Sequence, residues 1–144
     1  MLSMYPAIFF KDEPDGYSVL FPDLNHLATC GDDEEEAMAM AIDCLAGYLH
    51  TSWLDNDKVP EPSKLNDIDL DSYLKEYEID CGFKAKDAFV TMVSVDVEEY
   101  AKLHFKKSVR KTLTIPVWLE KEAREAKINF SKTLQEALMK KLHY

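Results

Sequence analysis

The sequence predicts an α+β fold in two parts: a small sheet with a long helix, followed by a C-terminal strand–helix–helix unit. Short apolar runs separated by turn residues fill positions 1–31, and a long amphipathic pattern follows from about residue 33. The last 37 residues place one alternating run before two amphipathic segments. With 144 residues, 47% hydrophobic and 31% charged, the chain has globular composition and room for one domain or two small ones.

The opening segment is typical of an antiparallel meander. Residues 5–10 are apolar and β-prone, and the turn-forming sequence that ends at Gly16 separates them from an alternating run at 17–21. Pro22 ends that run because proline cannot donate a hydrogen bond to a neighbouring strand. Residues 27–30 complete the pattern, so we expect three short strands.

A helix is predicted over residues 33–52. Asp32 is the expected N-cap, and Glu35 occupies the position of a capping-box partner. An apolar stripe at helical spacing should pack on the meander; it comprises Ala37, Met38, Ala41, Ile42, Leu45, Tyr48 and Leu49.

The middle of the chain is acidic. Pro60 and Pro62 indicate an extended linker, and three aspartates lie between residues 67 and 71. We expect a short helix at 70–77, a strand of β-branched residues at 89–95 and a further helix at 96–106.

The C-terminal segment has the sharpest pattern. Residues 108–115 alternate, so that Val109, Leu113 and Ile115 would share one face of a strand. Pro116 stops the strand and suits the first turn of a helix, and Asn129 should cap a second helix.

A unit of this size cannot enclose a core alone, but a second copy would pair the two strands and cover the helices. The expected dimer core is Leu113, Ile115, Leu119, Ala123, Leu134 and Leu138.

Such a paired ribbon fits the DNA major groove. The polar face of the strand would then contact bases, through Arg110, Thr112 and Thr114. Phosphate contacts are expected from Lys107, Lys111, Asn129, Phe130, Ser131 and Lys132. Taken singly, each residue is more simply a solvated side chain or a helix cap; only the combined order favours a ribbon-helix-helix. A helix-turn-helix is disfavoured because a strand directly precedes the helices.

Charge is unevenly distributed. The net charge is −10, but residues 1–104 carry 23 acidic and 7 basic residues, whereas residues 105–144 carry 4 acidic and 10 basic residues. An acidic domain at 1–106 and a basic, polyanion-binding domain at 107–144 would explain this contrast, and a merely solvated basic helix pair would also do so.

Several motifs together resemble those of HicB-type antitoxins. They are the segments 5–9, 15–17, 21–24 and 31–37, then 112–119 and 128–131. The resemblance implies a degenerate RNase-H-like N-terminal domain and a C-terminal ribbon-helix-helix. It also implies an antitoxin that inhibits a HicA-type RNase toxin and represses the shared operon by binding operator DNA. The toxin contacts are expected somewhere in the acidic N-terminal domain, and segment 64–87 departs from the compact family pattern.

Other functions have weaker support. Asp12, Asp15, Asp23 and Asp32 could hold metal ions of a nuclease, but they are better explained as turn and cap residues. We therefore expect no enzyme, metal site or cofactor. The three cysteines form no CxxC motif and we expect no signal peptide, which favours free thiols in the cytoplasm. No apolar run is long enough to span a membrane.

Three questions stay open at this stage. The chain could be a ribbon-helix-helix repressor whose acidic domain senses a partner or ligand without any toxin. It could also be an interaction module that dimerises but does not bind DNA. The sequence does not decide between a homodimer and a tetramer.

Overall fold

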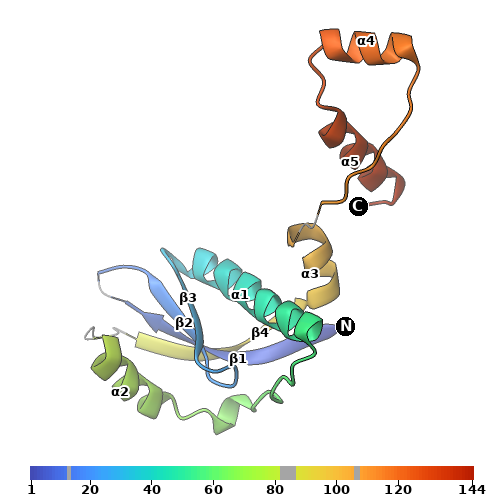
Figure 1. Ribbon diagram of the computed structural model, residues 1–144. Coiled ribbons are helices and arrows are strands. Elements are labelled where there is room, and N and C mark those ends of the chain that lie inside the picture. The colour runs from blue at the N-terminus through green and yellow to red at the C-terminus, as the bar shows by residue number, and fades with distance from the viewer. Residues whose placement is uncertain (13, 82–86, 106–107) are drawn as a thin grey trace. The chain divides into compact units, whose positions relative to one another are not determined.

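The computed structural model describes residues 1–12, 14–81, 87–105 and 108–144. The chain divides into two compact units, Met1–Lys107 and Ser108–Tyr144 (Figure 1).

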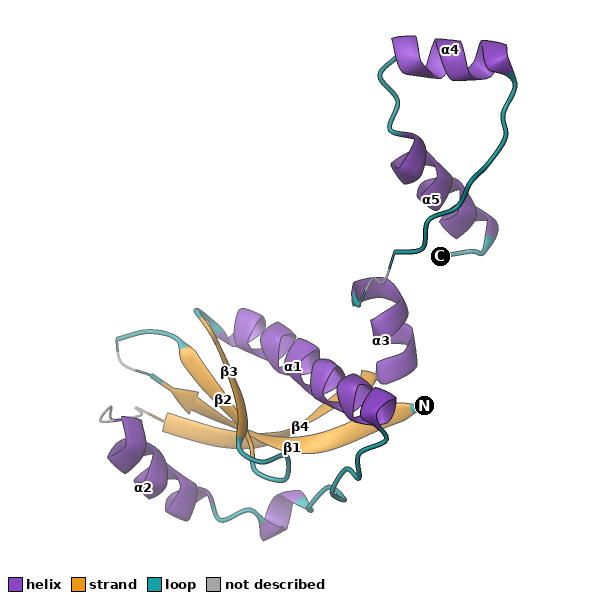
Figure 2. Ribbon diagram, viewed as in Figure 1, coloured by secondary structure: helices purple, strands orange, loops and turns teal. Residues whose placement is uncertain are grey.

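A four-stranded antiparallel sheet forms the centre of the first unit (Figure 2). Its strands are β1 (Leu2–Lys11), β2 (Tyr17–Phe21), β3 (Leu27–Gly31) and β4 (Asp87–Asp96), in the order β3-β2-β1-β4. β1 pairs with β4 along its whole length, and β2 joins it on the other side. The four strands expected within residues 1–106 are confirmed, and β1 and β4 are longer than their apolar runs suggested.

Helix α1 (Glu34–Asp55) covers one face of this sheet, and α3 (Val97–His104) follows β4 (Figure 1). The core lies between α1 and the odd-numbered residues of the strands, as side-chain alternation requires. Its buried members are Tyr5, Ala7, Phe9, Val19, Phe21, Leu24, Ala37, Ala41, Leu45, Ala46, Leu49, Val93, Val95 and Val97.

The start of α1 differs from the expectation by one residue. Asp33 is the N-cap, and its side chain accepts a hydrogen bond of 2.8 Å from the Glu36 backbone N–H. Glu36 in turn accepts from the Asp32 N–H, at 2.6 Å. The predicted pair, Asp32 and Glu35, was wrong because in a run of five acidic residues the local pattern fits two registers equally well.

The second face of the sheet is covered by the acidic segment whose role the sequence left open. This segment forms a short 3₁₀ turn, η1 (Leu65–Asp67), and helix α2 (Leu70–Cys81), on the side of the sheet away from α1 (Figure 1). The Tyr77 ring stacks on Phe10 at 4.2 Å, and its hydroxyl donates to Asp12 at 2.6 Å. Ile8 and Phe10 are thereby fully buried.

Two contacts hold the linker between α1 and η1 against the sheet. The Tyr5 hydroxyl donates to the Pro60 carbonyl at 2.6 Å, and burial together with nearby Glu61 and Asp23 raises the pKa of Tyr5. Asp23 accepts from both the backbone N–H and the hydroxyl of Ser63, at 2.8 and 2.7 Å. The extended linker is confirmed, and these bonds explain how it is held.

The second unit contains α4 (Val117–Glu125) and α5 (Phe130–Lys141). Both predicted helices are present, but Pro116 lies at the N-cap, before the first turn. Residues 108–115 form no strand, contrary to the expectation. A strand is defined by hydrogen bonds to a neighbour. The expected neighbour was a second copy, and no described segment of the same chain pairs with these residues.

Two glycines allow a matched test of how the end of β3 packs against the start of α1. A Cβ atom at Gly31 would lie 2.3 Å from the backbone nitrogen of Ala37, whereas at Gly47, inside α1, the nearest atom is Phe105 Cζ at 3.8 Å. We expect Gly31→Ala to lower the free energy of unfolding by about 1–3 kcal/mol through overpacking. Gly47→Ala should raise it by about 0.5–1 kcal/mol, because alanine restricts the unfolded chain more than glycine. Urea denaturation measures both, and a Gly31→Ala variant as stable as the parent would contradict this packing.

Candidate DNA-binding and partner-binding surfaces

The turn between α4 and α5 is defined by its own hydrogen bonds. α4 ends as Lys127 takes a left-handed conformation, with φ of 55°, and the Ile128 N–H donates to the Ala123 carbonyl at 3.0 Å. Asn129 caps α5, its side-chain oxygen accepting from the Lys132 N–H at 3.0 Å. The predicted cap is confirmed.

No residue of this second unit is buried. Of the expected dimer-core side chains, Leu113 is 62% exposed, Leu138 52% and Leu119 41%. Ala123 and Leu134 are half-buried. Trp118 and Phe130 are also open to solvent. Taken by itself, this unit therefore leaves a large apolar surface uncovered, which soluble proteins rarely do without a partner.

The residues proposed to read bases are accessible. Arg110, Thr112 and Thr114 are all exposed, and within the described chain no hydrogen bond or ion pair engages the Arg110 guanidinium. Arginine can form two parallel hydrogen bonds with guanine, and threonine offers a hydroxyl and a methyl group. The structure leaves these groups available without placing them on a shared strand.

The start of α5 presents backbone donors to solvent. The Asn129 side chain occupies the Lys132 N–H, so the first-turn N–H groups of Phe130 and Ser131 are those suited to a phosphate. The Lys132 ammonium lies 3.9 Å from Glu136, an exposed and weak ion pair. Lys111 is exposed, and Lys107 lies outside the described residues.

Acidic residues of the first unit gather at one end of the sheet. Because Tyr17 pairs with both Lys11 and Gly31, the β1–β2 turn and the start of α1 lie at the same end. The acidic positions there are Asp12, Asp15, Asp32, Asp33, Glu34, Glu35, Glu36 and Asp87. The glutamates of the first turn of α1 are exposed, and they also stabilise the positive end of its dipole.

Two of the carboxylates that could have served a nuclease are engaged in structural bonds. Asp12 accepts from the hydroxyls of Tyr77 and Ser18 through its two oxygens, at 2.6 and 2.7 Å. Asp23 likewise uses both oxygens on Ser63. Across residues 1–12, 14–81, 87–105 and 108–144 no group of three His, Cys, Asp or Glu side chains could hold a metal ion.

The thiols of Cys30 and Cys44 are free. Cys30 is exposed and Cys44 half-buried. Burial, followed by the charge of Asp43, raises the pKa of the Cys44 thiol, which disfavours the reactive thiolate. No helix in the described part of the chain is long and apolar enough to cross a membrane.

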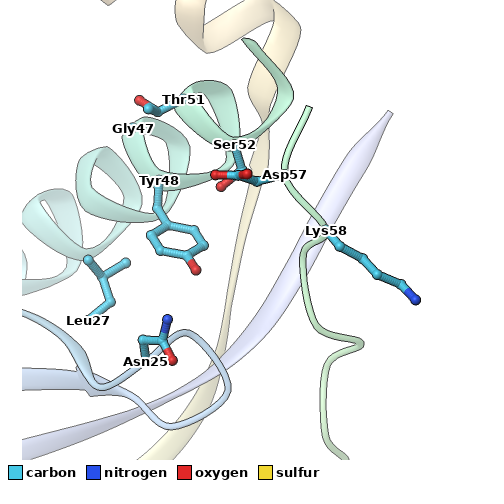
Figure 3. Close-up of a pocket in the computed structure, with 8 residues that line it drawn as sticks. All are labelled: Asn25, Leu27, Gly47, Tyr48, Thr51, Ser52, Asp57 and Lys58. Atoms are coloured by element: carbon cyan, nitrogen blue, oxygen red, sulfur yellow. The ribbon is translucent and has the colours of Figure 1, made fainter. Parts of the chain in front are cut away.

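A pocket that the sequence did not predict lies beside the C-terminal half of α1 (Figure 3). It has a volume of about 550 Å³, and the Tyr48 side chain points across it toward Asn25, whereas Lys58 points away. No sequence signal could have found it, because its walls come from three separate segments. They are lined by Asn25, Leu27, Gly47, Tyr48, Thr51, Ser52, Asp57 and Lys58.

Comparisons with known proteins show which class of protein this chain resembles. Residues 4–74 match the family described as HicB_like antitoxin of bacterial toxin–antitoxin systems. Antitoxin HicB 1 of Photorhabdus laumondii is 41% identical over 58 residues, which are 40% of this chain and 37% of that protein. The chain thus matches well under half the length of this relative.

Two solved structures are similar over nearly the whole chain. A chain of a toxin–antitoxin complex from Streptococcus pneumoniae is 36% identical, with 98% of this chain and 99% of that chain covered and a TM-score of 0.64. The Burkholderia pseudomallei antitoxin HicB is 18% identical over 97% and 98% of the two chains, with a TM-score of 0.50, and supports the fold alone.

These matches define a regulatory protein rather than an enzyme. The chain belongs to the HicB-like antitoxin family of bacterial toxin–antitoxin systems.

Proposed function

We propose that this chain is an antitoxin that binds and neutralises a small HicA-type RNase toxin through its first unit. The observation that carries the proposal is the 36% identity, over almost the full length of both chains, to a chain of a toxin–antitoxin complex. An antitoxin of this kind acts in the cytoplasm, where free thiols such as Cys30 and Cys44 stay reduced.

Charge supports this role. Residues 1–104 carry 23 acidic residues against 7 basic ones. We expect a toxin that cleaves RNA to present a basic surface to its polyanionic substrate. The acidic unit can therefore attract such a toxin at long range and compete with RNA for its basic face. On this account the first unit is a degenerate RNase-H-like domain, whose carboxylates Asp12 and Asp23 serve packing instead of metal binding.

DNA binding forms the second part of the proposal. Two copies would pair residues 108–115 as an antiparallel ribbon and bury the apolar faces of α4 and α5 in one shared core. The ribbon would then present Arg110, Thr112 and Thr114 to the major groove of operator DNA. Lys107, Lys111 and the start of α5 would contact phosphates. Through this dimer, the chain would repress its own operon.

Growth measurements test the antitoxin role. Inducing the small reading frame beside this one should arrest growth, and producing this chain with it should restore growth. A variant carrying Arg110→Ala, Thr112→Ala and Thr114→Ala should restore growth equally well, because toxin binding is assigned to the first unit. If the neighbour is harmless, or if arrest persists when both proteins are present, a repressor with a partner- or ligand-sensing domain becomes the better description.

Operator binding tests the ribbon. Arg110→Ala should weaken specific binding by about 1–3 kcal/mol for each half-site. Lys111→Ala should weaken binding to all sequences and lower the salt dependence by about one counterion for each half-site. Titrations of labelled operator DNA at several salt concentrations measure both effects. Arg110→Lys, which keeps the charge but loses the bidentate geometry, is the control for sequence reading. Affinity that does not change with salt would rule out this interface.

A further inference from the structure

We propose that the outer edge of β4 is where a strand of the basic partner protein adds to the sheet. The inference rests on the proposed antitoxin function and names the surface that would serve it. The sheet order β3-β2-β1-β4 leaves β3 and β4 as its two edges (Figure 2). β4 is ten residues long, and all ten residues are paired with β1 on its inner side.

The two edges are protected very differently. Natural proteins guard an exposed edge with charges, proline, bulges or short strands. β3 has only five residues, and the Cys44 thiol of α1 reaches the Ala28 carbonyl, with 3.9 Å between sulfur and oxygen. Between its terminal residues, Asp87 and Asp96, β4 carries no charged residue, proline or glycine. Its outer edge is thus a long, uncharged template for another strand.

The even-numbered residues of β4 direct their N–H groups outward. The Ala88 N–H donates to its neighbour Asp87 at 2.8 Å, away from the ladder with β1. Pro6 gives independent support for this direction. It lies opposite Met92 and has no N–H to donate, which fits a pair whose backbone groups point away from each other. Even residues of β1 must therefore face β2, as the bond from the Asp12 N–H to the Gly16 carbonyl also shows.

This parity leaves the outward amides of Val90, Met92 and Ser94 as the donors for an added strand. No backbone group of the described residues beyond β1 bonds to this part of β4. The strand is also held rigidly, because Phe89 stacks on Phe9 at 5.1 Å and Val93 is buried. A preformed edge of this kind lowers the ordering cost of binding.

Charge identifies the occupant as a basic partner and not a second copy. Two β4 strands could pair antiparallel only with even residues opposite even residues, for example Met92 opposite Met92. That register places Asp96 of each copy opposite Ala88 and therefore beside Asp87 of the other copy, and like charges brought close together are destabilising. Each copy would also bring its own excess of acidic residues to the contact. A lysine or arginine side chain flanking the partner's strand would instead meet Asp87, because the Asp96 carboxylate already accepts from the Met1 ammonium and the Glu99 N–H.

Residue-resolved amide hydrogen exchange tests the inference. The full-length chain is measured by NMR alone and in complex with the co-purified product of the neighbouring reading frame. We expect exchange at Val90, Met92 and Ser94 to slow at least about tenfold in the complex. Thr91 and Val93, which already bond to β1, should change little. The outward amides of the opposite edge, Ala28 and Cys30, are the internal control.

A proline variant provides the matched binding test. Ser94 is exposed, so Ser94→Pro removes one outward N–H while leaving the ladder with β1 intact; Ser94→Ala keeps the N–H. Ser94→Pro should weaken the complex about tenfold or more, because it removes a donor and blocks close approach, and Ser94→Ala should not. If circular dichroism shows that Ser94→Pro does not fold, the exchange data on the parent chain decide whether the β4 edge binds the partner.

The outcomes separate the two proposals. A complex that forms without slower exchange at the even residues overturns the edge assignment and leaves the antitoxin role in place. Absence of any complex overturns the proposed function itself. Concentration-dependent protection of the same amides in the free protein would show that a second copy occupies the edge, and would also overturn the inference.

Discussion

Most apolar side chains of residues 108–144 are left uncovered within their own unit. Leu113, Leu119 and Leu138 are all substantially exposed, although the helices that carry two of them are well formed and capped. Burial of such surface is the main favourable term in folding, at about 25 cal/mol per Å². The second unit therefore depends on contacts from outside itself, and the proposed pairing with another copy would satisfy both the helices and the unpaired segment before them.

The first unit has the opposite character. α1 covers one face of its sheet, and α2 with the preceding linker covers the other, so its core is complete within one chain. Carboxylates such as Asp12 and Asp23 hold these layers together through short hydrogen bonds. The remaining acidic groups stay at the surface, where they can act on a partner. A self-contained acidic unit joined to a dependent basic unit fits a protein that binds one partner while assembling through its other end.

Much of this architecture could be predicted from residue patterns. The strands, α1 and both C-terminal helices follow from apolar periodicity and from capping residues such as Asn129. The N-cap of α1 could not be fixed to one residue, because Asp32 and Asp33 both lead into a run of glutamates. The packing of α2 on the sheet could not be predicted, although a helix at this place in the sequence was. This packing depends on Tyr77 meeting Phe10, 67 residues away in sequence. The sequence pattern predicted that a strand at 108–115 would need a second copy to pair with, and within the described part of one copy these residues have no strand neighbour.

The most direct test of this account is the mass of the full-length chain in solution. Sedimentation equilibrium over a range of concentrations should give a dimer or a multiple of it. Leu134→Glu, which would place a charge at a half-buried position of the proposed shared core, should shift the chain to a monomer while the circular dichroism of the first unit persists. A parent chain that stays monomeric at concentrations well above micromolar would contradict the claim that a second copy completes the C-terminal unit.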